Sequence, residues 1–287
     1  RVVAGSLGTA RAGNIAHMYL DASDIRARFP QFVVTPDMEA VYEPGAYAIL
    51  AENARLRMLD EAVGRGARLV YGERVVALAE SQGHATITTS TGWKVSAGAV
   101  LVCAGAWGAR LVPELKDLTT PHRVPIFWFE PKPGRAAYFG EQSFPTFLYE
   151  EAEGALLYGI PSVASAELGV KIGFHNRQRV PADPHREPPA IDAFEREIEQ
   201  HVDRIFPDLD PSPRDAKWCF YTMSADESFI IDRSSQHNRV FYASACSGHG
   251  FKFAPAVGQA LAELGLGLRP SVSTAHFGAS RFGRPFG

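Results

Sequence analysis

Apolar and polar positions alternate along the chain with two different periods. Apolar residues recur every three to four positions over 51–66, which predicts an amphipathic helix. Its apolar face consists of Leu56, Leu59, Ala62 and Val63. Further helices are expected over 21–29, where Pro30 stops the pattern, over 191–205, and from Pro255 onward, because proline fits the first turn of a helix.

Shorter apolar runs predict strands. They cover 67–71 and 75–78, and a hairpin joins 85–89 to 93–95 through a turn at Ser90-Thr91-Gly92. Residues 99–103 are continuously apolar, as expected of a strand buried on both faces, and a helix should begin at 104–107. This order of elements is typical of one half of an α/β nucleotide-binding fold.

The pattern of predicted helices and strands changes after residue 118. Strands over 124–130, 155–158 and 169–174 are separated by proline-rich loops. From Cys219 onward the pattern is again that of an α/β domain, with a strand over 240–244. We therefore predict an α/β (α+β) protein of two interleaved domains. One α/β domain would comprise 46–117 and 219–287, and a domain with a mixed or antiparallel sheet would comprise 1–45 and 118–218.

Composition adds little to this picture. Of the 287 residues, 46% are hydrophobic and 21% are charged, and the net charge is −3, so neither a nucleic-acid nor a membrane partner is indicated. The longest apolar stretch, 97–107, is too short to span a bilayer. Three cysteines favour a reducing compartment, and we expect a cytoplasmic location. Charged residues on the predicted helices are interpreted as solvated: Asp60, Glu61, Asp192 and Glu195.

Candidate chemistry is concentrated near the C-terminal end. Cys219 lies in Lys217-Trp218-Cys219-Phe220-Tyr221-Thr222-Met223, Asp226-Glu227-Ser228-Phe229-Ile230-Ile231-Asp232 follows, and then Ser247-Gly248-His249-Gly250-Phe251-Lys252-Phe253. A thiol, a tyrosine, a histidine and a lysine thus surround a glycine-rich turn that opens a helix. This combination favours a redox cofactor site. No grouping of Cys and His has metal-ligand spacing, so no metal is expected.

These three segments resemble the family of monomeric sarcosine oxidase, N-methyltryptophan oxidase and pipecolate oxidase, which are FAD-dependent amine oxidases of the D-amino-acid-oxidase-like superfamily. Other segments resemble the family at matching spacing: Val102-Cys103-Ala104-Gly105-Ala106-Trp107, Leu157-Tyr158-Gly159-Ile160-Pro161-Ser162 and Val170-Lys171-Ile172-Gly173-Phe174-His175. The resemblance covers essentially the whole chain. It implies that the α/β domain is a Rossmann-like domain for FAD and that the other domain binds the substrate.

The chain departs from the family pattern at its start. The family opens with a Gly-x-Gly-x-x-Gly turn that holds the FAD pyrophosphate, whereas Gly5, Gly8 and Gly13 have the wrong spacing. The chain begins at Arg1. We expect that the N-terminal βαβ unit, roughly the first quarter of a complete enzyme, lies outside this sequence.

The resemblance assigns roles to three residues, each with a simpler alternative. Cys219 would bond through sulfur to the flavin, although a buried structural thiol is the alternative. Lys171 would stand near flavin N5 and promote reaction with oxygen, and a solvent-facing strand lysine is the alternative. His175, four residues on and so on the same strand face, would contact the amine, unless it is a core histidine.

Further residues follow from the same resemblance. Tyr158 and Tyr221 would line the substrate cavity, although both could be plain core residues. Lys252 would pair with the substrate carboxylate at a helix start, where a lysine suggests a nearby anion. The cofactor-binding set is completed by Val75, Ala104, Gly105, Trp107, Ser247, Gly248, His249, Gly250 and Phe251. Cys103 and Cys246 are interpreted as packing residues.

The implied activity is oxidation of the C–N bond of a secondary amino acid, either N-methyl or cyclic. The resulting imine would hydrolyse, and O2 would be reduced to H2O2. We expect a monomer of bacterial origin that takes a small-molecule substrate. Two alternatives remain: a flavin dehydrogenase of the same fold that uses another electron acceptor, and an inactive or binding-only fragment.

Overall fold

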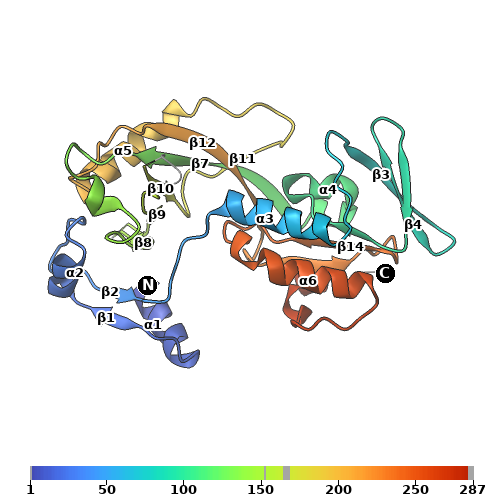
Figure 1. Cartoon of the computed structure of the whole chain (residues 1–287), viewed down its shortest axis with the longest axis horizontal. Helices are drawn as coiled ribbons and strands as arrows, with labels where there is room; N and C mark the ends of the chain where they lie inside the picture. The colour runs from blue at the N-terminus through green and yellow to red at the C-terminus, as the bar shows by residue number, and fades with distance from the viewer. Residues whose placement is uncertain (1, 152, 164–168, 284–287) are drawn as a thin grey trace. The chain divides into compact units, whose positions relative to one another are not determined.

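The computed structural model describes residues 2–151, 153–163 and 169–283. The chain forms two units. The first comprises Arg1–Ala48, Val124–Arg179 and Pro188–Cys219, and the second comprises Ile49–Arg123, Val180–Glu187 and Phe220–Gly287. Strands β7 (Thr119–Phe129) and β12 (Asp215–Ser224), both labelled in Figure 1, pair with each other. The predicted fold class, with α/β and antiparallel-sheet parts, is confirmed.

The first unit is built on an antiparallel sheet. Its strands lie in the order β7–β10–β9–β8, with β12 beside β7, where β8 is Phe147–Glu150, β9 is Leu156–Ile160 and β10 is Val170–Phe174. Helix α5 (Asp192–Ile205) presents apolar side chains four and three positions apart. The core between them comprises Phe127, Phe129, Leu157, Val170, Ile172, Phe174, Ile198, Val202 and Ile205. Burial of this one sheet face leaves the opposite face available for polar chemistry.

The N-terminal segment of the first unit contains short elements. They are α1 (Val2–Ala12), β1 (Met18–Leu20), α2 (Ala22–Arg28) and β2 (Ala40–Tyr42), and β1 pairs antiparallel with β2. The helix expected over 21–29 is therefore confirmed. Asp21 caps α2 by accepting hydrogen bonds from the N–H groups of Ser23 and Asp24. Helix α1 was not predicted, and glycines at positions 5 and 8 lower its intrinsic propensity.

The second unit centres on a three-stranded sheet. Strand β14 (Val240–Ser244) pairs antiparallel with β13 (Ile230–Arg233) and parallel with β6 (Val100–Val102). Helix α6 (Ala254–Gly265) packs on this sheet through Leu261, and Pro255 stands in its first turn as predicted. Shorter elements complete the unit: α4 (Gly108–Leu111), β11 (Val180–Pro181), and the 3-10 turns at Gly105–Trp107, Pro113–Lys116, Phe251–Phe253, Ala275–Phe277 and Ala279–Phe282.

A separate meander consists of β3 (Val75–Ser81), β4 (His84–Thr89) and β5 (Lys94–Ala97). The hairpin expected between β4 and β5 is confirmed. The turn between β3 and β4 was missed. Gln82 and Gly83 have φ values of 51° and 79°, so this two-residue loop has positive φ at both positions, as a type I′ hairpin turn requires.

Three sequence-based predictions are wrong. Residues 67–71 form no strand, and Tyr71 is 74% exposed, because this segment pairs with no strand in the described chain. Residues 99–103 are not buried on both faces in the described structure, since Val102 is 5% exposed but Leu101, which points to the opposite face, is 41% exposed. Cys103 is likewise exposed and is not a packing residue.

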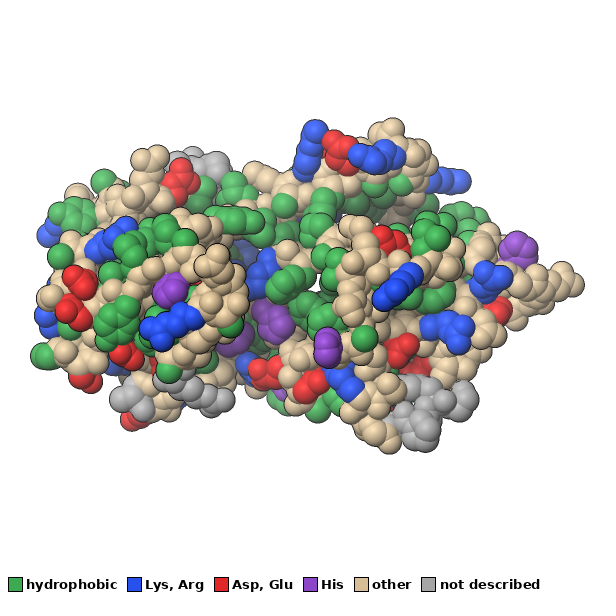
Figure 2. Space-filling view, turned by 90° about the horizontal axis from the view of Figure 1, so that it is seen from below, with side chains coloured by type: hydrophobic (Ala, Val, Ile, Leu, Met, Phe, Trp, Pro, Cys, Tyr) green, Lys and Arg blue, Asp and Glu red, His purple; other side chains and the backbone are tan. Residues whose placement is uncertain are grey.

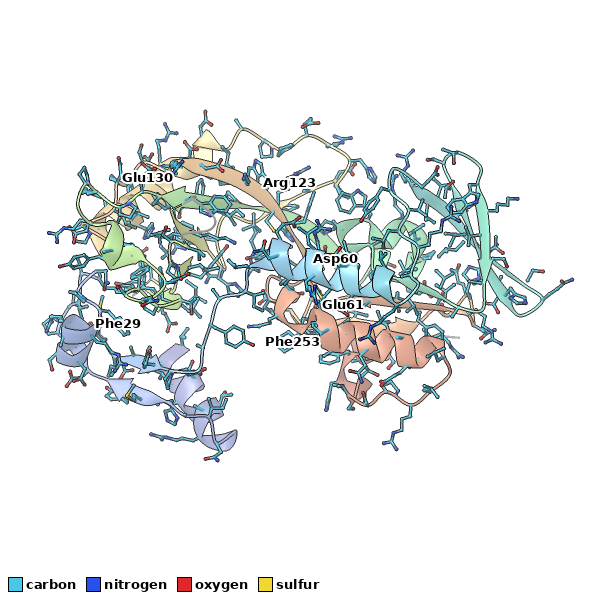
Figure 3. The ribbon with its side chains drawn as sticks, in the orientation of Figure 1. Phe29, Asp60, Glu61, Arg123, Glu130 and Phe253 are labelled. Carbon is cyan, nitrogen blue, oxygen red and sulfur yellow. The ribbon has the colours of Figure 1, made fainter. Side chains whose placement is uncertain are left out.

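Helix α3 (Ala51–Gly64) confirms the predicted helix, but its apolar face is not covered. No α3 residue is buried in the described structure, and Leu56 and Val63 are exposed. Asp60 and Glu61, labelled in Figure 3, are exposed as expected. Hydrophobic side chains also lie among charged ones on the face of the molecule seen in Figure 2. Among the helices of the described chain, none has the length and apolar character needed to cross a membrane.

Candidate functional site

Lys171 projects from the face of the first unit's sheet that is turned away from α5. It pairs directly with Trp128 on β7, which lies between the fully buried Phe127 and Phe129 and therefore points to the opposite face. The Lys171 Nζ atom is 5.9 Å from the centroid of the Trp128 ring and 5.7 Å from that of Tyr158. Two aromatic rings thus flank one ammonium group.

The position of Tyr158 depends on a glycine. Gly173 pairs with Tyr158, and a Cβ atom at position 173 would lie 3.2 Å from the Tyr158 hydroxyl and 3.3 Å from its ring. Because glycine has no side chain, the tyrosine ring lies over β10, next to Lys171. The structure therefore brings together Tyr158 and Lys171, two of the predicted site residues.

Lys171 and Cys219 also interact electrostatically. Burial lowers the pKa of the Lys171 ammonium below its ordinary value, and an electrostatic interaction with Cys219 partly opposes this shift. Cys219 itself is exposed. The alternative of a buried structural thiol is therefore wrong, and the thiol is open to a reaction partner.

Sequence reasoning missed two residues on this face. Lys217 precedes Cys219 by two positions, so both project to the same side of β12. The Lys217 Nζ atom is 5.3 Å from the Trp128 ring centroid and 3.2 Å from Asp215 Oδ2. Trp128 therefore stands between two lysines. The alternation of side chains along β7 and β12 indicates which residues of each strand share a face. The contact between Trp128 and Lys217 also depends on the pairing of the two strands, which the sequence did not reveal.

His175 lies just beyond β10, at a bend. Its backbone N–H donates to the Leu156 carbonyl at 2.7 Å, and its own carbonyl accepts a hydrogen bond from Arg179 Nη2 at 2.7 Å. The backbone on both sides of this histidine is therefore held in place. Its expected contact with the amine stays a prediction.

The glycine-rich turn of the second unit follows β14 and is closely packed. Gly248 has φ +86°, and a Cβ atom there would lie 2.6 Å from the ring of Tyr221. A Cβ atom on Gly250 would lie 1.4 Å from the Ala245 carbonyl oxygen. The buried Ser247 hydroxyl accepts from the Ser224 N–H and donates to the Thr222 carbonyl. Only glycines permit this backbone path. The Tyr221 ring, which is 7% exposed, packs directly against Gly248.

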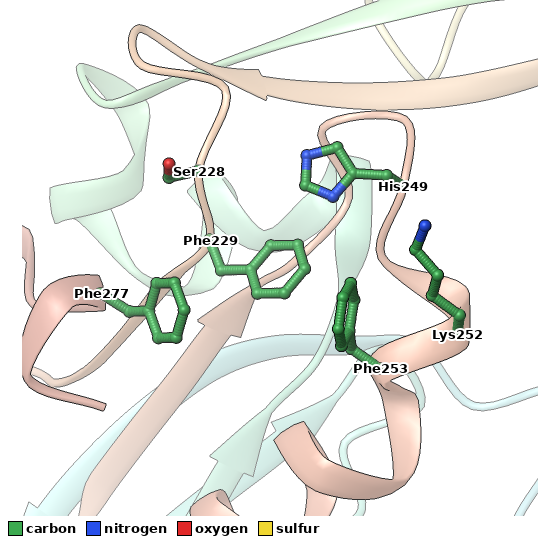
Figure 4. Close-up of a pocket in the computed structure, with 6 residues that line it drawn as sticks. All are labelled: Ser228, Phe229, His249, Lys252, Phe253 and Phe277. Atoms are coloured by element: carbon green, nitrogen blue, oxygen red, sulfur yellow. The ribbon is translucent and has the colours of Figure 1, made fainter. Parts of the chain in front are cut away.

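Beside this turn lies a pocket of about 330 Å³, lined by Ser228, Phe229, His249, Lys252, Phe253 and Phe277. Figure 4 shows the Lys252 ammonium and the His249 ring on one side of the hollow and the three phenylalanine rings around it. The Lys252 Nζ atom is 5.6 Å from the Phe253 ring centroid, and the His249 ring is 5.2 Å from that of Phe229. Phe251, in the same 3-10 turn as Lys252, is 43% exposed. A planar, electron-rich ligand suits a pocket with a cation and aromatic walls.

The remaining predicted cofactor residues lie elsewhere in the second unit. Ala104 and Gly105 follow β6, and Gly105 has φ +51°. The Trp107 ring is 43% exposed and meets the ring of Phe220 edge-on at 5.5 Å. Val75 is the first residue of β3. The structure places these residues without assigning them a ligand.

Solved structures share this fold. NikD, an unusual amino acid oxidase essential for nikkomycin biosynthesis, superposes in its open form with a TM-score of 0.78 at 19% identity, over 96% of this chain and 72% of that one. L-proline dehydrogenase from P. horikoshii also gives a TM-score of 0.78, at 18% identity, over 97% of this chain and 72% of that one. These similarities show that the chain shares the fold of these two proteins.

Sequence comparison identifies the family. Residues 3–264 match the DAO family of FAD-dependent oxidoreductases, and the chain belongs to this family. Monomeric sarcosine oxidase of Streptomyces avermitilis is 33% identical over 275 residues, which are 96% of this chain and 70% of the relative. N-methyl-L-tryptophan oxidase of Salmonella heidelberg is 34% identical over 265 residues, covering 92% and 68%. The family prediction made from the sequence motifs is thus confirmed.

Proposed function

We propose that this protein oxidises the C–N bond of a secondary amino acid, N-methyl or cyclic, and passes the electrons to O2 to yield H2O2. The observation that carries the proposal is the exposed Cys219 thiol within electrostatic range of the desolvated Lys171 ammonium on an aromatic sheet face. The relatives that match over most of the chain are named for sarcosine and N-methyltryptophan oxidation.

The residues present fit a flavin. Cys219 is exposed and would hold the ring through a sulfur bond. Gly248 and Gly250 occupy positions where any side chain would collide with Tyr221 or with the Ala245 carbonyl, so only glycines allow the turn to take this path beside the pocket. When bound, FAD supplies the acceptor for the hydride equivalent removed from the C–N bond.

The protein's own groups then have distinct tasks. Lys171 holds a fixed positive charge in a half-buried position, where it stabilises negative charge that develops as oxygen is reduced. Lys252 offers an ammonium group to the substrate carboxylate, and Tyr158 and Tyr221 would line the substrate cavity. His175 would contact the amine, which must lose its proton before oxidation.

Acid precipitation of the purified protein tests the cofactor assignment. We expect yellow colour in the pellet, because a covalent bond survives unfolding. Cys219→Ala should abolish this colour, whereas Cys103→Ala, which alters another exposed cysteine, should keep it. A colourless wild-type pellet, or a yellow Cys219→Ala pellet, would refute attachment through Cys219.

Substrate oxidation needs a separate assay. Sarcosine, other N-methyl amino acids, proline and pipecolate should be supplied with O2, and H2O2 should be measured. Peroxide formed with at least one of them supports the oxidase. Turnover with an artificial electron acceptor but without peroxide would instead establish the dehydrogenase. A cytoplasmic location and a monomeric state remain predictions.

A further inference from the structure

The turn that joins β12 to β13 is fastened by one carboxylate. Asp226 accepts hydrogen bonds from the Ser224 hydroxyl at 3.0 Å and from the Ser228 N–H at 3.1 Å. Arg281 donates to both of its oxygens, from Nε at 2.7 Å and from Nη2 at 3.0 Å. This paired arrangement is the strong form of an arginine–carboxylate bond, and it holds the pKa of Asp226 far below its ordinary value.

Arg281 is itself held from the other side. Its Nη1 atom donates to the carbonyls of Phe277 and Gly278, at 2.9 and 3.1 Å, and its guanidinium carbon is 4.2 Å from the Phe282 ring centroid. The Arg281 side chain is 21% exposed. Because these contacts hold its side chain in one orientation, this arginine connects the C-terminal 3-10 turns to the β12–β13 turn.

The fastened turn has a strained residue at its tip. Glu227 has φ +55°, in the left-handed region that non-glycine residues rarely occupy. In this conformation its carbonyl oxygen lies 3.0 Å from His249 Nε2. A carbonyl can only accept, so Nε2 carries the proton, and in the neutral ring Nδ1 is an acceptor. Figure 4 shows one ring nitrogen of His249 directed toward the chain at Ser228 and the other toward Phe253.

We propose that Arg281 and Asp226 are positioning residues, which act through the Glu227 carbonyl to fix the His249 ring and present its Nδ1 as an acceptor in the pocket beside the Lys252 ammonium. An acceptor at this place matches an N–H group on the edge of a planar heterocycle. The inference rests on the proposed function, because it specifies which edge of such a ring the pocket recognises.

The test measures the His249 ring directly, in the ligand-free chain labelled with ¹⁵N-histidine. His249→Gln identifies the signals of this ring. In the wild type we expect an Nε2–H proton that exchanges slowly with water. Arg281→Met should accelerate this exchange by at least about tenfold, since the hydrogen bond to the carbonyl is lost. Arg281→Lys, which keeps one ionic contact, should be intermediate.

Arg57→Met is the matched control, because it removes an exposed arginine–carboxylate pair in the same unit, and it should leave the exchange rate unchanged. A proton on Nδ1 in the wild type would overturn the proposal, and so would an unchanged rate in Arg281→Met. If Arg281→Met fails to fold, Asp226→Asn weakens the same arginine–carboxylate bond with a side chain of nearly the same size. The position of the His249 proton and its exchange rate then decide in the same way. None of these readouts needs flavin, so a failed oxidase assay would leave this test intact.

Discussion

The glycine-rich turn gives a sharp prediction, because Gly250 in the turn and Gly258 in the following helix α6 should respond oppositely to substitution by alanine. Gly250 has an ordinary helical conformation, with φ −79° and ψ −29°, so alanine is not excluded by its backbone angles. The obstacle is steric. An added Cβ atom would lie 1.4 Å from the Ala245 carbonyl oxygen and 2.6 Å from its carbon, and both are backbone atoms that cannot rotate away.

The expected cost follows from this overlap. Forced backbone shifts in well-packed regions destabilise by about 1–3 kcal/mol. Gly258 in α6 is exposed and has no atom within 4 Å of its added Cβ, so Gly258→Ala should stabilise by about 0.5–1 kcal/mol through helix propensity. For a domain of this size, 1 kcal/mol corresponds to about 2–4 °C in melting temperature.

Scanning calorimetry of the two variants checks the reasoning. Gly250→Ala should melt at least about 2 °C below the wild type, and Gly258→Ala should melt about 1–4 °C above it. Gly250→Ala should also retain less flavin, since the displaced turn no longer has the path on which the proposed site depends. A Gly250→Ala melting temperature equal to that of the wild type would show that the turn is looser than the structure describes.

Three further predictions concern packing and burial, and urea unfolding of the variants checks them. Ile198→Ala opens a cavity between α5 and its sheet and should cost about 2–5 kcal/mol, whereas the exposed Arg196→Ala on the same helix should change stability by less than about 0.5 kcal/mol. Lys171→Met should stabilise the flavin-free chain. Because burial lowers the pKa of Lys171, the wild type should gain stability as pH rises through the folded pKa toward the unfolded value, and Lys171→Met should lack this gain. Tyr242→Phe should stabilise by about 1 kcal/mol, since the buried Tyr242 hydroxyl finds no hydrogen-bond partner in the described residues, and burial raises its pKa. A loss of stability in either of the last two variants would contradict the stated burial costs.

Local patterns predicted much of the fold. The strand expected over 240–244 has those bounds in the structure, and the helix expected over 191–205 begins one residue later. Both carry their signal within a few consecutive residues. The segment 67–71 has equally apolar character but forms no strand, because a strand also needs a partner, which a single sequence does not identify.

The residues of the candidate site were likewise predictable only where a local sequence motif marks them. Motifs led to Lys171, Cys219 and the glycine turn, since these residues stand in recognisable local contexts. Trp128 was missed because its role depends on the pairing of β7 with β10. Arg281 was missed because Asp226, its partner, lies 55 residues away and no local pattern connects them. Contacts of this kind arise only when the chain folds.

The half-buried position of Lys171 supports a functional interpretation more strongly than its spacing does. Removing an ammonium group from water costs stability, and the lowered pKa of this lysine records that cost. Among the residues that the structure describes, no carboxylate offsets this shift of the Lys171 pKa. Its neighbours are instead the two rings and the Cys219 thiol. An apolar residue on β10 would stabilise the unit better, so a lysine at this position is best explained by the charge that it supplies to a reaction on this face.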